Sequence, residues 1–318
     1  MFFLQPPKIA DTEVFTRMPE RFRRTGVRSA WADANRGGQA TDSFLEGPVF
    51  DGAGHLFVCD IPFGRIFRID PEGQWEQVAE WDGEPNGMKF LSPGVLLVTD
   101  YRNGLMACDV ATGAVRPYLE RRNSERFKGV NDLVFDRAGN LYFTDQGQSG
   151  LHDPSGRLYR LRPDGRLDLL LSNVPSPNGV ALSPDERVLY LAVTRGNQVW
   201  RVPLMEDGSV SKVSAFFTSY GPSGPDGLAV DESGRVIVAN PGLGLVWVLS
   251  TRAEPVQVLR SCAGSSLTNL AFGGPDRKTL YCTESVTGTV LKYAMDVAGL
   301  PICRGQGHSD STPSRAIV

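Results

Sequence analysis

The sequence predicts an all-β chain folded as a single six-bladed β-propeller, with four antiparallel strands per blade. Three observations lead to this prediction. A short phrase recurs six times along the 318 residues, a second phrase follows each copy at a nearly constant distance, and turn-forming residues separate the two. The 35 glycines and 22 prolines are spread along the chain, which indicates many short elements joined by turns.

The first phrase is a polar residue, often followed by glycine, that opens an alternating apolar stretch. Successive copies are 40, 45, 47, 48 and 43 residues apart. The six opening residues are Glu46, Asn86, Asn131, Asn178, Asp226 and Asn269. A period of about 40 to 50 residues is typical of propeller repeats.

The second phrase is an apolar stretch that ends in a polar residue. It occupies residues 56–60, 96–100, 141–145, 189–194, 236–240 and 280–284. Tight turns such as residues 51–54 separate the two phrases, so each pair predicts an antiparallel hairpin. A third strand follows, as at 64–69, and a fourth after another turn, as at 75–79, which completes a four-stranded blade.

The ring must close, because an open end would leave a bare strand edge. Residues after Leu300 and Pro301 offer no clear fourth strand for the sixth repeat, whereas residues 11–16 form a spare strand. We expect this N-terminal strand to close the last blade, within one domain over 1–318 whose propeller core covers about 45–301. Residues 17–44 are expected to be an irregular flap, an oligomer contact or a surface loop, and 304–318 a frayed tail.

Composition narrows the functional classes. Hydrophobic residues make up 41% and the net charge is −3, so no nucleic acid or membrane partner is expected. No apolar run approaches the ~18–20 residues of a membrane helix, and no secretory signal is expected at the start. The five cysteines include no C-x-x-C pair, and Cys59, Cys108 and Cys282 lie in apolar stretches. Reduced buried thiols and a cytoplasmic location are therefore expected.

Sequence motifs of several other enzyme classes are absent. The chain has no G-x-S-x-G elbow, no H-E-x-x-H, no P-loop and no G-x-G-x-x-G. These absences argue against serine esterases of the α/β-hydrolase type, zinc proteases, nucleotide hydrolases and dinucleotide enzymes.

The six opening residues are expected to meet, because the first strand of each propeller blade lines the central channel. Two carboxylates and four amides would then share one channel mouth. Buried carboxylates pair, take up protons or bind a cation, and no Lys or Arg occupies an equivalent repeat position. Oxygen ligands suit hard divalent cations, Ca²⁺ best, with Mg²⁺ or Mn²⁺ as alternatives. The competing interpretation is turn chemistry alone, above all at Asn86 and Asn269.

Several of these motifs, in this order, resemble the regucalcin (senescence marker protein)/gluconolactonase family of six-bladed propellers. The segments that carry the resemblance are residues 45–48, 123–124, 131–136, 141–145, 176–179 and 225–228. The resemblance extends over about 45–295. Residues 126–130, just before Asn131, depart from the family pattern, which leaves sugar specificity open.

The resemblance implies one catalytic divalent metal held by Glu46, Asn178 and Asp226, with Asn131 contacting the metal or the substrate. Ca²⁺ is favoured, with Zn²⁺, Mn²⁺ or Mg²⁺ as alternatives. The implied activity is hydrolysis of sugar lactones or related esters, so the expected partner is a small lactone or ester. Related propellers hydrolyse aryl esters and organophosphates.

In the expected mechanism Asp226 activates a water molecule as general base, with direct attack by Asp226 as the variant. Loops after the second strands would rim the same mouth and bind substrate through Tyr101, Arg102, His152 and Arg195, unless these are ordinary surface groups. Asp60, Asp100 and Asp145 are expected to be structural. Two alternatives to the lactonase remain: an aryl esterase or organophosphate hydrolase on the same scaffold, and a non-catalytic calcium-binding propeller.

Overall fold

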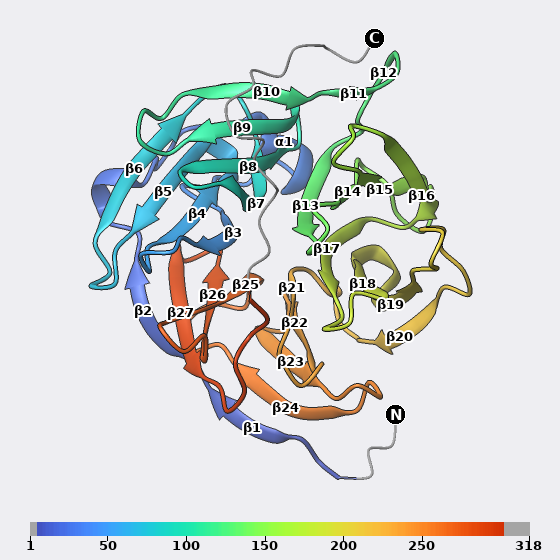
Figure 1. Ribbon diagram of the computed structural model, residues 1–318. Helices are drawn as coiled ribbons and strands as arrows, with labels where there is room; N and C mark the ends of the chain where they lie inside the picture. The colour runs from blue at the N-terminus through green and yellow to red at the C-terminus, as the bar shows by residue number, and fades with distance from the viewer. Residues whose placement is uncertain (1–4, 302–318) are drawn as a thin grey trace.

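Six β-sheets surround a central channel in the computed structural model, which describes residues 5–301 (Figure 1). The first three blades follow the repeat. Blade 1 contains β3 (Leu45–Phe50), β4 (Leu56–Asp60), β5 (Arg65–Ile69) and β6 (Trp75–Glu80). Blade 2 contains β7 (Pro85–Ser92), β8 (Val95–Asp100), β9 (Gly104–Asp109) and β10 (Val115–Leu119). Blade 3 contains β13 (Val130–Phe135), β14 (Leu141–Asp145), β15 (Gly156–Leu161) and β16 (Leu167–Val174).

The last three blades continue the ring. Blade 4 contains β17 (Pro177–Leu182), β18 (Val188–Val193), β19 (Gln198–Pro203) and β20 (Ser214–Thr218). Blade 5 contains β21 (Leu228–Val230), β22 (Val236–Asn240), β23 (Leu245–Leu249) and β24 (Pro255–Arg260). Blade 6 contains β25 (Leu267–Gly273), β26 (Thr279–Glu284) and β27 (Thr289–Ala294). A small hairpin, β11 (Arg121–Arg122) with β12 (Glu125–Arg126), lies between blades 2 and 3. The predicted six-bladed propeller is confirmed.

Neighbouring blades pack face to face through apolar side chains. Between blades 1 and 2 the buried contact includes Phe57, Ile66, Met88, Phe90 and Val98, each at most 2% exposed. Inner strands such as β4 and β18 are buried along their whole length because they have a neighbouring blade on each face. The rigid wall that results fixes where the first strands present their polar ends.

The N-terminal segment closes the ring. β2 (Glu13–Arg17) pairs antiparallel with β27 and forms the outer strand of blade 6, as the spare strand at 11–16 predicted. β1 (Lys8–Asp11) was not expected: it pairs parallel with β24 and adds a fifth strand to blade 5. Figure 1 shows both strands along the outside of the last two blades.

Residues 18–44 connect this closing strand to blade 1 across the face where the first strands begin. The connection contains η1 (Glu20–Phe22), a 3-10 helix, and α1 (Ala30–Asn35), whose Ser29 side chain caps the amide of Ala32. The tail expected at 304–318 lies outside the described residues.

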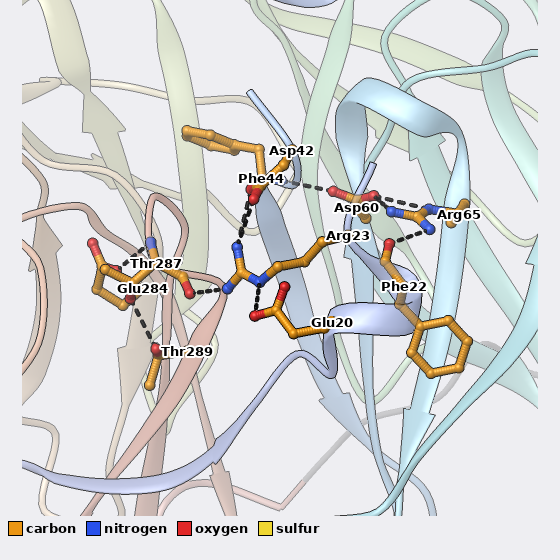
Figure 2. Close-up of polar contacts among 10 residues, drawn as sticks. All are labelled: Glu20, Phe22, Arg23, Asp42, Phe44, Asp60, Arg65, Glu284, Thr287 and Thr289. Carbon is orange, nitrogen blue, oxygen red and sulfur yellow. Dashed lines mark hydrogen bonds and ion pairs between the residues drawn. The ribbon is translucent and has the colours of Figure 1, made fainter. Parts of the chain in front are cut away.

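Figure 2 shows how this connection is fixed by Arg23. Its guanidinium donates to both carboxylate oxygens of Asp42 at 3.0 Å and to the backbone carbonyl of Thr287 in blade 6. On the blade 1 side, buried Arg65 donates to Asp60 and, at 2.7 Å, to the carbonyl of Phe22. The connection is thus tied to the first and last blades.

Within the described range, no helix combines the length and hydropathy that a membrane crossing requires. Cys59, Cys108 and Cys282 are buried free thiols, as predicted, and Cys262 is an exposed one. Cys303 lies outside the described residues.

Candidate functional site

Side chains from widely separated parts of the chain meet at the mouth where the first strands begin. Asn269 on β25 donates from Nδ2 to Oε2 of Glu46 on β3 at 2.8 Å, across 223 residues of sequence. The Asn178 side chain on β17 hydrogen-bonds to Asp226, and Glu46 is close enough to raise the pKa of the Asp226 carboxyl. The structure therefore brings together both carboxylates and the amides on either side of them.

Local strand geometry aims these side chains at the mouth. The pairing register of the first strand shifts between Glu46 and Val49, between Val130 and Leu133, and between Pro177 and Val180. Such bulges bend a strand and redirect its side chains. Each site residue on β3, β13 and β17 lies within such a shift.

Glycine follows several of the site residues because adjacent blades approach very closely there. A Cβ on Gly179 would lie 2.3 Å from the carbonyl oxygen of Asp226, and one on Gly47 would lie 2.0 Å from that of Asn86. Only Gly47 of these two has a positive φ, +55°. Close approach between blades therefore accounts for the repeated glycine better than turn chemistry does.

Hydroxyl groups of the preceding blade clamp the backbone at or next to three of the site residues. Thr144 Oγ1 donates to the carbonyl of Asn178 at 2.9 Å, and Thr99 Oγ1 donates to that of Asn131. Thr194 Oγ1 donates to the carbonyl of Pro225, next to Asp226, at 2.7 Å. The role of these threonines in holding the backbone was not predicted from the sequence. The signal was a Thr at or just before the polar end of the second phrase.

Acids at the ends of the second strands are structural, as expected, although the expected backbone bonds between blades are instead bonds within one blade. Asp60, Asp100 and Asp145 accept backbone N–H bonds from Phe44 at 2.7 Å, Glu84 at 3.0 Å and Gly129 at 2.8 Å. In each case the donor belongs to the segment that leads into the first strand of the same blade. These carboxylates fix the approach to the site.

Burial and mutual repulsion raise the pKa values of the two site carboxylates. Glu46 is 3% exposed, and burial raises its pKa to about 7, with Asp132 adding to the shift. The pKa of Asp226 is raised well above its usual range by burial, then by Glu46 and Asp132. The Asp226 side chain is only partly buried, so it remains accessible from the channel mouth.

Asp132 is a third carboxylate close to the site, and it was not predicted from the sequence. It is buried and raises the pKa of both Glu46 and Asp226. Its oxygens accept the backbone amides of Leu133 at 2.8 Å and Val180 at 3.2 Å. The signal was an acid in the second position of the first phrase, where most repeats have glycine.

The donor set fits a hard divalent cation. Asn131 Nδ2 donates to Gln146 at 3.2 Å, which leaves the buried Asn131 Oδ1 without a partner. Glu46, Asn178 and Asp226 add two carboxylates and an amide nearby. Among the described residues, no three His, Cys, Asp or Glu side chains form a metal-binding group, so amide oxygens would have to complete the set.

The predicted substrate residues occupy different positions on the rim. Exposed Arg195 is close enough to Asp226 to act against the rise of its pKa, and exposed His152 lies in the loop after β14, near Arg195. Tyr101 OH accepts from Gln148 at 2.9 Å, and burial raises the pKa of Tyr101 to about 12. Arg102 forms an exposed ion pair with Asp82 at 2.5 Å.

Comparison with known proteins shows the family of this chain. The profile of the SMP-30/gluconolactonase/LRE-like region matches residues 44–286. Lactonase drp35 of Staphylococcus haemolyticus is 32% identical over 224 residues, which cover 67% of this chain and 68% of that protein.

Solved structures share the fold. A calcium-binding regucalcin from Agrobacterium tumefaciens superposes with a TM-score of 0.77 at 21% identity, covering 95% of this chain and 100% of that one. A gluconolactonase from Xanthomonas campestris superposes with a TM-score of 0.70 at 20% identity, and the match covers 94% of this chain and 100% of that one. The chain belongs to the SMP-30/gluconolactonase/LRE-like family.

Proposed function

We propose that this protein is a divalent-metal-dependent hydrolase that opens a lactone ring. The observation that carries the proposal is the pair of carboxylates Glu46 and Asp226, close enough for Glu46 to raise the pKa of Asp226, together with the buried, unpartnered oxygen of Asn131 at the start of another first strand of the ring. The family, and a relative named as a lactonase, support lactones as the substrate class.

Glu46, Asn178, Asp226 and Asn131 would hold the metal. When bound, a divalent cation would polarise the lactone carbonyl and stabilise the developing negative charge. Asp226, the partly exposed carboxylate, takes the proton from the attacking water. Asn269 and the amide of Gly47 hold the Glu46 carboxylate through 2.8 Å hydrogen bonds, so Glu46 stays oriented while Asp226 exchanges protons.

The chain's own residues also position the substrate. Gln146 holds the amide of Asn131, and its own amide donates to Ser176 at 2.9 Å, so the Asn131 oxygen keeps one orientation. Arg195 and His152 are placed to bind hydroxyl or carboxylate groups of the substrate at the rim.

A substrate panel tests this proposal. Purified protein is assayed on aldonolactones, aromatic lactones, aryl esters and phosphotriesters, before and after chelation and with single metals added back. Asp226→Asn is expected to lower lactone kcat by about 10²- to 10⁴-fold. Asp153→Asn, an exposed acid on the rim, is the matched control and should retain activity.

Each outcome separates the candidates. Lactone turnover that chelation removes and one metal restores supports the proposal. Preferred turnover of aryl esters or phosphotriesters would favour the esterase alternative. Metal binding without turnover of any substrate would favour a calcium-binding propeller.

A further inference from the structure

Beyond the polar ring, the central channel holds a cavity of about 170 Å³. Its wall is made by the apolar continuation of the first strands, including Val49, Val134, Ala181, Ala229 and Ala271. Each of these lies two or three residues past a site residue, so the cavity lies roughly 7–10 Å deeper, toward the opposite face. This cavity is separate from the proposed lactone site.

Lys89 on β7 introduces one ammonium group into this wall. It is half-buried, and Nζ donates one hydrogen bond, to the Met88 carbonyl at 3.2 Å. An ammonium carries three donors, so two remain available. Asp132 is close enough for Lys89 to lower its pKa, but no hydrogen bond or ion pair joins the two side chains, and the Asp132 oxygens accept backbone amides instead.

The other cation of the cavity wall is already committed. Arg137 donates to the carbonyl of Pro184 at 2.8 Å and lies 3.7 Å from Glu186 in an ion pair. Leu300 and Pro301 complete the rim on the opposite face. The cavity therefore offers an apolar chamber with one underused positive charge.

We propose that this cavity binds a small aromatic acid. Its carboxylate group pairs with Lys89, and its ring lies against the alanines and valines of the first strands. A cavity of about 150 Å³ with apolar walls holds a benzene-sized ring, so an arylacetate has the right size. The single ammonium selects an acid over a neutral or cationic analogue. The proposal does not depend on metal binding or on lactone hydrolysis.

Titration calorimetry of the full chain in excess chelator, with phenylacetate as the probe, tests the site. Lys89→Met should weaken binding about 10- to 100-fold, because it removes a charged hydrogen-bond donor and keeps a chain of similar size. Ala229→Leu should weaken it at least as much by filling the cavity without changing any charge. Arg137→Gln is the matched control and should change the Kd by less than about threefold, since its charge is already paired.

Neutral phenylacetamide should bind at least about tenfold more weakly than phenylacetate to the unmodified chain. Equal affinity for the acid and the amide would overturn the proposal, as would unchanged phenylacetate binding in both Lys89→Met and Ala229→Leu, or no binding by the full chain.

Discussion

At the residue scale, the site depends on carboxylates held close together without a fixed positive charge between them. Asp132 raises the pKa of Glu46, both Glu46 and Asp132 raise that of Asp226, and burial is the largest cause of the two raised values. A cation between Glu46 and Asp226 would stabilise both ionised carboxylates and so lower their pKa values again. The same groups that would bind a metal therefore also make the metal-free site favour protons.

Metal affinity should consequently rise with pH. With a pKa of about 7, Glu46 is mostly protonated at pH 6 and mostly ionised at pH 8, and the proton competes with the metal. From Glu46 alone the apparent Ca²⁺ affinity should increase about tenfold over this range. Calorimetric Kd values at the two pH values check this.

The Glu46→Gln variant is the control for this titration. Its Ca²⁺ affinity should be weaker, and the rise in affinity of about tenfold from pH 6 to pH 8 that is due to Glu46 should be absent. An affinity of the unmodified chain that stays flat from pH 6 to pH 8 would contradict the assignment of Glu46 as a ligand.

The sequence repeat alone predicts that Glu46, Asn131, Asn178 and Asp226 share one mouth, because equivalent positions in a ring converge, and the structure brings Glu46, Asn178 and Asp226 together. Asp132 was missed because it follows a site residue directly, where strand alternation would turn it away from the mouth. The bulge between Val130 and Leu133 breaks that alternation. Bulges of this kind depend on pairing between strands, which one strand's sequence does not reveal.

At the element scale, each first strand is positioned by the blade before it. Thr99, Thr144 and Thr194 hold the backbone at or beside Asn131, Asn178 and Asp226. The clamp acts across the blade boundary, so it sets distances among the proposed metal ligands that no single blade could fix.

Thr144→Val should therefore weaken both the fold and the metal site. The buried carbonyl of Asn178 would lose its partner, at a cost of about 1–3 kcal/mol in the free energy of unfolding. Ca²⁺ affinity should fall as well, because Asn178 would move. Chemical denaturation and calorimetry measure the two effects.

Thr279→Val, at the opposite end of a second strand, is the matched control. It should change the stability by less than about 0.5 kcal/mol and leave Ca²⁺ affinity unchanged. Equal effects from the two substitutions would show that the hydroxyl clamp does not position the site.

Strand alternation predicted the blades well because most strands pair with a sequence neighbour across a tight turn. β1 was missed for the opposite reason. Its partner β24 lies about 250 residues away, and the four residues of β1 carry no alternation of their own. Its pairing comes from tertiary context.

At the scale of the whole molecule, the ring is closed by β2, and residues 18–44 then cross from blade 6 to blade 1 beside the channel mouth. Arg23 ties this connection to Asp42 and to the carbonyl of Thr287 (Figure 2). The sequence predicted the closing strand, because a bare edge had to be covered, but not this arginine.

Arg23→Met should lower the free energy of unfolding by about 2 kcal/mol, since charged hydrogen bonds in a mostly buried position are lost. It should also speed limited proteolysis within 18–44. Arg28→Met is the control, because its ion pair with Asp33 is exposed and contributes less than about 1 kcal/mol. If both variants were cleaved and unfolded alike, the role given to Arg23 would be wrong.

The measurement that tests the central claim most directly compares metal binding with turnover in one preparation. Lactone hydrolysis and calorimetric binding are followed against free Ca²⁺, or against whichever metal restores activity, for the unmodified chain and for Glu46→Gln. We predict one ion per chain, half-maximal activity at the binding Kd, and a parallel shift of both curves in the variant. Lactone turnover that persists in excess chelator, or that is unchanged in Glu46→Gln, would contradict a metal-dependent site at this mouth.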